Sequence, residues 1–437
     1  MKTLLERAKG SALDVITHRN APISAIVQLS PHAQQIRHLK FVIKHWTDIT
    51  TFSGVTSGPL PLLRTLEINA MNIFHTNSQP IAVIPPSVPL FEGALNLERF
   101  LFCSKLHHLL NHFVFPNLTT FELSIWQDEF DVSYLFNFLV SSPVLRTVEV
   151  KIDTLIMRES VPRGTAIVLP NLETFSLSLS GGKAARIYSI TDYISRPCTR
   201  RTSLTREISN EDMAPGLEIF PTSVSWDTIV HQYTTSPSEE IMLEIEHHYL
   251  GVDGCSLTFR SSNTPIVTLD FNVDESGLDE GEMHMSFQEM GYEVFLQAFR
   301  TIQHYPLLSH VKRLYIKYRA SISDVGLLQQ MADEFGKLLR SLGPLDEFTI
   351  YDNGQDMTIA TFFNPRGLDS GVEPVIFPPI KALKVVCHSM GFDEDKTVEA
   401  IERFMQSQSR LGLPFERVTL CTRVSEIELP RGVVELA

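Results

Sequence analysis

The sequence predicts an α/β repeat fold, a curved solenoid with parallel strands on its inner side and helices on its outer side. The first observation behind this prediction is a recurring phrase. FPNLTTFEL at 115–123 returns almost unchanged as LPNLETFSL at 169–177, and SPVLRTVEV stands midway between them at 142–150. The leucine in the fourth position of each phrase recurs at an interval of 27 residues. Fixed intervals of this length are typical of repeat proteins.

The second observation is the shape of the repeating unit, apolar-x-x-apolar-x-apolar, usually with a proline shortly ahead of it. Its last two apolar positions alternate with other residues, which predicts a strand with one buried face. One unit buries too little apolar surface to fold alone, so neighbouring units are expected to share a core and a parallel sheet. The units start at Ile36, Leu63, Leu97, Leu118, Leu145, Leu172, Val311, Leu345, Ile380 and Phe415.

The third observation is that helical patterns separate some of these strands. Apolar residues recur at helical spacing in 131–142, 324–343 and 393–412. Gly343 and Gly412 each stand shortly before a proline, which favours the end of a helix there. We therefore expect a repeat of strand, turn and returning helix.

A single solenoid over 1–437 is predicted, with three sections. Residues 1–180 hold regular repeats, 181–305 are irregular, and 306–437 hold longer repeats. The irregular section is either a set of degenerate repeats or an antiparallel insertion. Within it we expect strands at 241–250, 255–261 and 265–273, an acidic loop at 274–283 and a helix at 292–305.

The composition restricts the function classes. The net charge is −14, with 51 acidic and 37 basic residues, which argues against nucleic acid as a partner because phosphate binding requires a basic face. The N-terminal MKTLLERAKG carries charges where a signal peptide needs an apolar run, and no stretch has the length of a membrane span. An intracellular protein, cytoplasmic or nuclear, is expected. The cysteines are scattered without a CxxC pair and are interpreted as reduced thiols: Cys103, Cys198, Cys255, Cys387 and Cys421.

The unit resembles a leucine-rich repeat in its irregular form, over residues 36–177 and 311–420. The asparagine that many such repeats carry three residues after the last apolar position is matched well only by Asn353. Together with LERAKGSALDVI at 5–16, HVKRLYI, PLDEFTI and FPPIKALKV, the pattern looks like a fungal F-box/leucine-rich repeat protein. In that family SALDVI at 11–16 would form the first strand.

The resemblance implies a substrate-recognition region without catalytic residues or cofactors. Family members dock through an N-terminal F-box on the adaptor of a cullin-type ubiquitin ligase. The present sequence begins at the repeats, and no segment matches that box. Three functions follow: a non-catalytic protein-interaction scaffold, a ubiquitin-ligase receptor whose F-box is missing from this sequence, and, least favoured, an enzyme on a repeat scaffold.

The candidate partner-binding face consists of the residues between the last two apolar positions of each unit, which must point away from the core. Stacked strands place these residues in a row about 4.8 Å apart. Glu67, Glu122 and Glu149 give the first half an acidic stripe, which arginines at neighbouring positions partly neutralise. The predicted binding residues are Glu67, Leu101, Glu122, Glu149, Tyr315 and Lys384, and the alternative is an ordinary solvated sheet face.

Three short motifs carry weaker signals. His108 and His112 have the spacing of zinc ligands, but Leu109 stands where a zinc hydrolase has its glutamate, so no metal site is predicted. Cys387 and His388 are adjacent in an expected strand and point to opposite faces, which argues against a nucleophile–base pair and favours Cys387 as a small buried apolar residue. Arg-Arg-Thr-Ser at 200–203 resembles a kinase site at Ser203 in a loop.

Overall fold

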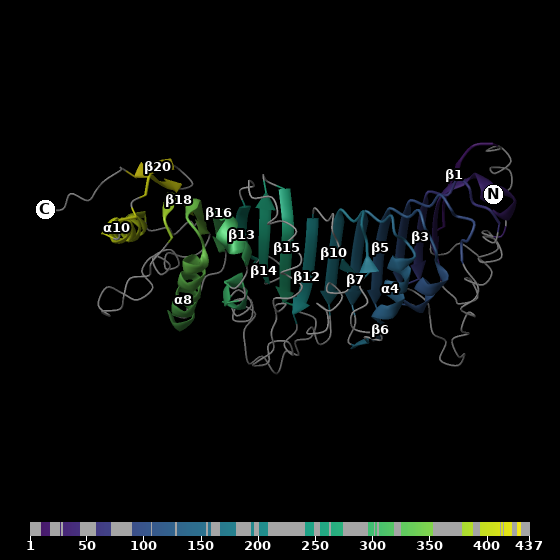
Figure 1. Ribbon diagram of the computed structural model, residues 1–437, viewed down its shortest axis with the longest axis horizontal. Coiled ribbons are helices and arrows are strands. Elements are labelled where there is room, and N and C mark those ends of the chain that lie inside the picture. Colours follow the sequence, from purple (N-terminus) through teal and green to yellow (C-terminus); the bar gives the residue numbers. More distant parts are fainter. Residues whose placement is uncertain are drawn as a thin grey trace. The chain divides into compact units, whose positions relative to one another are not determined.

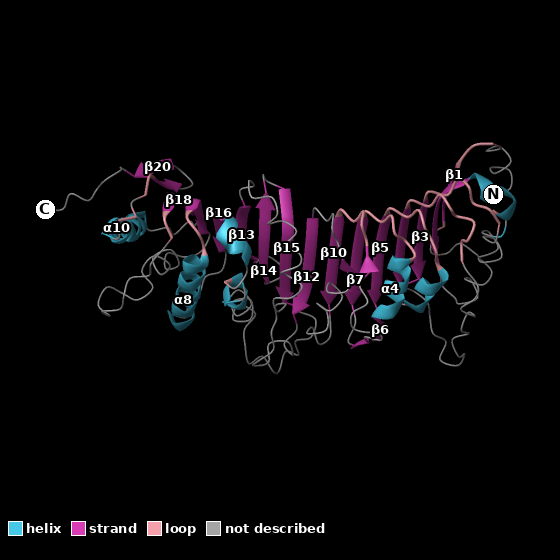
Figure 2. Ribbon diagram, viewed as in Figure 1, coloured by secondary structure: helices cyan, strands magenta, loops and turns pink. Residues whose placement is uncertain are grey.

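The computed structural model divides into two compact units, Met1–Thr202 (unit 1) and Ser203–Ala437 (unit 2), and each is described separately. The boundary falls inside the section expected to be irregular. Figures 1 and 2 show the strands and helices of both units. The structure describes residues 10–17, 27, 29–43, 58–70, 90–105, 107–126, 129–153, 156–158, 167–180, 194–195, 201–208, 241–248, 254–261, 264–273, 296–300, 302–303, 306–318, 325–352, 378–387, 394–410, 412–413, 415–421 and 426–429.

Unit 1 is built on a parallel sheet whose strands follow one another in the order of the sequence (Figure 1). Every neighbouring pair is parallel, including the first strand expected from the SALDVI phrase. The strands are β1 (Leu13–Ile16), β2 (Ile36–Val42), β3 (Thr65–Ala70), β4 (Arg99–Ser104), β5 (Thr120–Trp126), β7 (Thr147–Asp153) and β10 (Thr174–Ser180). Two short pairs accompany them: β6 (Glu129–Asp131) with β8 (Ile156–Arg158), and β9 (Ile167–Val168) with β11 (Ile194–Ser195).

The proline of each phrase stands in a tight turn that leads into the strand. The Leu118 N–H donates to the Phe115 carbonyl at 3.1 Å, and the Leu172 N–H donates to the Leu169 carbonyl at 3.2 Å. Proline occupies the second position of both turns, where its fixed φ is favourable. The leucine that closes the turn is fully buried in both. The Pro-x-Leu phrase therefore sets both the turn and the first core contact of a repeat.

The core of unit 1 consists of side chains that repeat in register from strand to strand. Phe100 on β4 lies opposite Leu66 on β3 and Phe121 on β5, and all three are completely buried. Around Phe100 the phenylalanine rings form a cluster, with ring centroids 5.0 Å away at Phe113 and 5.1 Å away at Phe115. Aromatic side chains bury large areas, so this cluster contributes strongly to the stability of unit 1.

The expected layer of outer helices is wrong. One predicted helix of unit 1 is confirmed as α4 (Val132–Val140), which begins after Asp131, whose carboxylate accepts from the Ser133 N–H at 2.9 Å. Elsewhere in the described part of unit 1, the connections contain short 3-10 helices, η1 (Ser30–Gln35) and η2 (His107–His112). Between β4 and β5, for example, η2 and the turn that starts at Phe115 take the place of a longer helix.

Unit 2 has a mixed sheet. β13 (Ile241–His248), β14 (Gly254–Ser261) and β15 (Thr264–Val273) form an antiparallel meander. Of the two structures expected for the irregular section, this part of it has the antiparallel one. β13 also pairs in parallel with β16 (Val311–Tyr318), which starts a second parallel run. That run continues through β17 (Leu345–Asp352), β18 (Ile380–Cys387) and β19 (Arg417–Cys421), and β20 (Glu426–Leu429) closes it antiparallel to β19. The predicted acidic loop at 274–283 and Asn353 lie outside the described residues.

The two helices predicted for the last section are confirmed as α8 (Val325–Ser341) and α10 (Glu394–Arg410). Residues 296–300, within the helix expected at 292–305, are helical as well, and η5 (Pro306–His310) precedes β16. Phe335 of α8 packs between Phe299 and Phe348 of β17, with ring centroids 5.9 Å and 5.8 Å away. Within the described part of the chain, no helix combines the length and apolar composition needed to cross a bilayer.

A buried carboxylate joins these helical segments of unit 2. Glu334 of α8 is 8% exposed and accepts from Lys337 at 2.9 Å, Gln303 at 3.1 Å and Arg300 at 3.3 Å. Burial raises the pKa of Glu334, but the three hydrogen bonds outweigh this effect and the net pKa is lowered. The carboxylate therefore remains charged and ties α8 to Arg300 and Gln303.

Candidate functional site

A continuous row of side chains crosses the open face of the unit 1 sheet. The strand registers place Lys40 opposite Glu67, Glu67 opposite Leu101, Leu101 opposite Glu122, and Glu122 opposite Glu149. Ser176 on β10 follows Glu149. This central row of Lys40, Glu67, Leu101, Glu122, Glu149 and Ser176 is the row that the sequence pattern predicts for unit 1.

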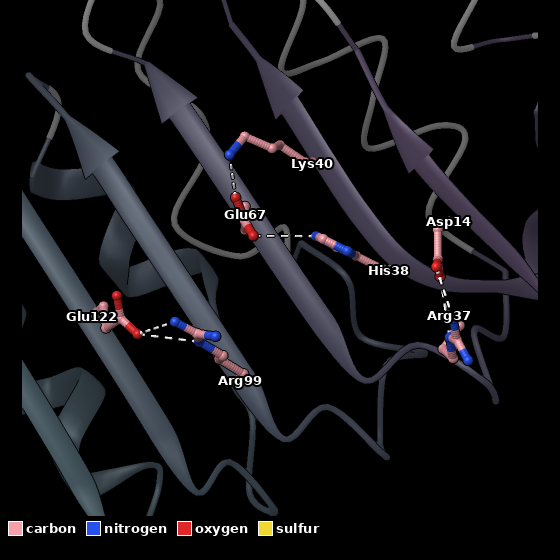
Figure 3. Close-up of polar contacts among 7 residues, drawn as sticks. All are labelled: Asp14, Arg37, His38, Lys40, Glu67, Arg99 and Glu122. Carbon is pink, nitrogen blue, oxygen red and sulfur yellow. Dashed lines mark hydrogen bonds and ion pairs between the residues drawn. The ribbon is translucent and has the colours of Figure 1, made fainter.

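Ion pairs connect the central row with its neighbours (Figure 3). The Lys40 Nζ lies 2.6 Å from one oxygen of Glu67, and the His38 Nε2 lies 3.2 Å from the other. Arg99 donates from Nε at 3.1 Å and from Nη2 at 2.6 Å to the same oxygen of Glu122. Glu67 and Glu122 of the acidic stripe are therefore paired with basic side chains on the preceding strand.

Glu67 is the most enclosed carboxylate among these pairs. Its side chain is 20% exposed, whereas the Lys40 side chain is 47% exposed. Burial raises the pKa of Glu67, but the hydrogen bond and charge of Lys40, with a smaller contribution from His38, reverse the effect and lower it. Asp14 at the edge strand has a lowered pKa because Arg37 hydrogen-bonds to it. Both carboxylates thus stay ionised in the folded protein at a lower pH than ordinary Glu and Asp side chains do.

Two carboxylates stand side by side between β5 and β7. Glu122 and Glu149 are directly opposite each other, a placement that destabilises a sheet when the charges are not compensated. Arg99 compensates Glu122 from β4, and Lys151 compensates Glu149 at 2.8 Å from within β7. The centre of the open face is consequently a mosaic of both charge signs.

Leu101 is the apolar member of the central row. It is partly exposed and lies between Glu67 and Glu122 in register. Cys103, two residues further along β4, points to the same face, and burial raises the pKa of its thiol. An apolar side chain flanked by charged groups is the composition expected of an anchor in a protein interface.

Sequence reasoning missed a ladder of hydrogen bonds at the start of the strands. The backbone carbonyl of Glu98 accepts from the N–H groups of Thr119 at 3.0 Å and Thr120 at 2.9 Å, and also from the Thr119 hydroxyl at 2.9 Å. Equivalent carbonyls each accept two N–H groups from the next repeat. This carbonyl ladder consists of Arg64, Glu98, Thr119 and Arg146.

Asparagine side chains reinforce the same edge. Asn96 donates to the Pro61 carbonyl at 2.9 Å, and Asn117 donates to the Leu95 carbonyl at 2.8 Å. Each asparagine directly precedes the first leucine of its unit, whereas the family pattern places the asparagine after the last apolar position. The recurrence of Asn-Leu in the repeated phrases was the signal that could have revealed these bonds.

The two remaining predicted binding residues lie in unit 2. Tyr315 on β16 is in register with Thr349 on β17, and Thr349 is in register with Lys384 on β18. Tyr315 stacks on Tyr351, with ring centroids 6.4 Å apart and ring planes at 20°. Burial, followed by the negative charge of Glu347, raises the pKa of the Tyr315 phenol. Tyr351 was not among the predicted residues, although its place two residues after Thr349 puts it on the same face.

The three short motifs singled out in the sequence contribute no residue to the central row. Ser203 lies in strand β12 (Arg201–Ile208), so the prediction of a loop there is wrong, and the adjacent Thr202 is 1% exposed. His112 is 4% exposed at the end of η2, a 3-10 helix, in which residues four apart do not share a face. Among the described residues, no three His, Cys, Asp or Glu side chains are placed to hold a metal ion. The side chain of Cys387, and all of His388, lie outside the described part of the chain.

No protein-family model and no curated protein matches the chain.

Proposed function

We propose that the chain is a non-catalytic protein-interaction scaffold that binds a protein partner on the open face of the unit 1 sheet. The observation that carries the proposal is the register of the central row over β2, β3, β4, β5, β7 and β10. A row of about 4.8 Å steps over several strands gives a long, flat contact surface. Charged side chains there can steer and orient a partner, while Leu101 supplies an apolar contact.

The finer fold proposal is a leucine-rich-repeat type of solenoid. Proline turns, parallel strands in sequence order and core residues repeated in register support it in unit 1. Repeat proteins of this kind bind partners through the side chains that their strands present. Service as a substrate receptor of a cullin-type ubiquitin ligase is a narrower version of the proposal, and it rests on the family resemblance of the sequence.

Affinity capture with two charge-reversed variants tests the proposal. Glu122→Lys places a reversed charge in the central row, whereas Glu173→Lys places one at the strand-start edge. The two are matched because each glutamate pairs with an arginine of a preceding repeat, Arg99 at 2.6 Å and Arg146 at 3.6 Å. A partner captured by the wild type and by Glu173→Lys, but lost from Glu122→Lys, is the expected result.

Two outcomes would contradict the scaffold proposal. One is a partner set that both variants retain equally, because the central row would then have no role in binding. The other is turnover of a small substrate by the purified chain with no protein partner recovered. Recovery of a ubiquitin-ligase adaptor together with the partner would support the narrower receptor version. Circular dichroism of all samples checks that both variants keep the fold.

A further inference from the structure

The open face of unit 2 carries an aromatic pair next to an arginine. The stacked rings of Tyr315 and Tyr351 come from neighbouring parallel strands. Arg313 precedes Tyr315 by two residues on β16 and therefore points to the same face. Its side chain is half-buried, and its Nε is shielded from solvent without a hydrogen-bond partner. Arginine and tyrosine are the residue types most enriched among the strong contacts of protein interfaces.

The two glutamates on the strands beside Arg313 are engaged elsewhere. Glu347 lies directly opposite Arg313, but it accepts from the Thr349 hydroxyl at 3.1 Å and hydrogen-bonds to Tyr315. Glu244, opposite Tyr315 on β13, is paired with Arg260 at 2.8 Å. The positive charge of Arg313 is thus left without an ion pair to either glutamate beside it.

We infer that this patch of Arg313, Tyr315 and Tyr351 binds an acidic side chain, Asp or Glu, of a protein partner. A carboxylate complements a guanidinium through charge-assisted hydrogen bonds, often two in parallel. The tyrosine rings provide the flat apolar surface on which the remainder of the segment packs. A polyanionic nucleic acid is disfavoured because phosphate binding needs several cations, whereas Glu347 and Glu244 lie on the strands beside Arg313. The inference extends the proposed scaffold function to a second face and names the chemistry of its partner.

Fluorescence anisotropy of the full chain with a labelled peptide of alternating Glu and Leu tests the inference. The wild type is expected to bind this peptide more tightly than a Lys–Leu peptide of the same length or a single-stranded oligonucleotide. Arg313→Gln is expected to weaken binding at least about tenfold, because it leaves the peptide carboxylate without its charged partner. Arg340→Gln, which removes an equal charge from the exposed end of α8, is expected to leave binding unchanged.

A variant that is expected to strengthen binding separates an effect on binding from an effect on folding. Glu347→Gln keeps the size of the side chain and one acceptor oxygen but removes the negative charge opposite Arg313. It is expected to strengthen binding of the Glu–Leu peptide a few fold, an effect that a folding defect cannot produce. The inference is overturned if the wild type does not prefer the Glu–Leu peptide, or if Arg313→Gln binds it as tightly as the wild type.

The two proposals fail independently. The peptide assay depends on Arg313 in unit 2, whereas the capture assay depends on Glu122 in unit 1. A partner lost from Glu122→Lys together with no peptide binding leaves the scaffold proposal standing and removes only the inference about an acidic partner. Peptide binding that responds to Arg313, with no captured partner, removes the proposal for unit 1 alone.

Discussion

Replacing Phe100 with alanine is expected to destabilise unit 1 more than any surface substitution. Phe100 is completely buried, and five phenylalanine rings surround it. Their centroids lie 5.0 Å, 5.1 Å, 5.8 Å, 5.8 Å and 5.9 Å away, at Phe113, Phe115, Phe102, Phe138 and Phe121 respectively. The substitution removes all of these contacts at once and leaves a cavity among the remaining rings.

The expected decrease in the free energy of unfolding follows from the size of the cavity and from the lost ring contacts. A buried Phe→Ala substitution costs about 3–5 kcal/mol in the free energy of unfolding. Each aromatic pair adds about 0.5–1.5 kcal/mol beyond its buried area, so a residue at the centre of several pairs belongs at the upper end of that range. The free energy of unfolding of a folded domain is normally about 5–15 kcal/mol, so the variant is expected to be marginally stable.

Urea unfolding combined with hydrogen exchange measures this loss. The amides of β4 and β5 should exchange faster in Phe100→Ala, because they flank the cavity. Leu95→Ala is the control, since Leu95 belongs to the same repeat but is 60% exposed, and its cost should stay within about 0.5 kcal/mol. Equal losses for the two variants would refute the conclusion that the phenylalanine cluster stabilises unit 1.

Three further substitutions test other features. Gly93→Ala should lower the melting temperature because the new Cβ would lie 2.4 Å from the Gly58 carbonyl oxygen, whereas Gly58→Ala, with nothing within 4 Å of its Cβ, should be nearly neutral. Asn117→Ala should cost about 1 kcal/mol in urea unfolding, since it removes the hydrogen bond to the Leu95 carbonyl, and no loss would show that water replaces it. Glu334→Gln should cost about 1–3 kcal/mol at neutral pH through its weakened hydrogen bonds to cations. The folded-state pKa of Glu334 lies below its unfolded value, so its stabilisation is present above the unfolded value of 4.5 and is lost as pH falls through the folded pKa. Unfolding free energies of the wild type and Glu334→Gln should therefore converge in that acidic window, and a constant difference would contradict the role of the charge.

The repeating phrase predicted the faces of the unit 1 strands because side chains in a strand alternate with a period of two. Once Leu118 and Phe121 are assigned to the core, Glu122 must point the other way, and equal spacing then aligns it with Glu149. The register of the central row follows from this reasoning without knowledge of the connections. Local periodicity therefore contained the information about the candidate face.

The connections were harder to predict because their spacing is compatible with several structures. The segment between β4 and β5 could hold a short helix by length alone, but it forms η2 and then the turn that starts at Phe115. Ser203 was assigned to a loop because of its basic, proline-flanked surroundings. It lies instead in the strand β12, and a strand forms only by pairing with other strands, which the local sequence does not reveal. The tyrosine pair of unit 2 likewise depends on the register between β16 and β17, which no single repeat reveals.

The carbonyl ladder makes each repeat of unit 1 interchangeable at its boundaries. The amides of Thr119 and Thr120 have positions equivalent to those of Arg146 and Thr147 in the next repeat. Excision of residues 120–146 would join Thr119 to Thr147 and present the amides of these two residues to the Glu98 carbonyl. A gene for such a protein can lose or duplicate one whole module without breaking the hydrogen-bonded seam between its neighbours. Sheets of different lengths are then available from one architecture by recombination, with no redesign of the remaining strands.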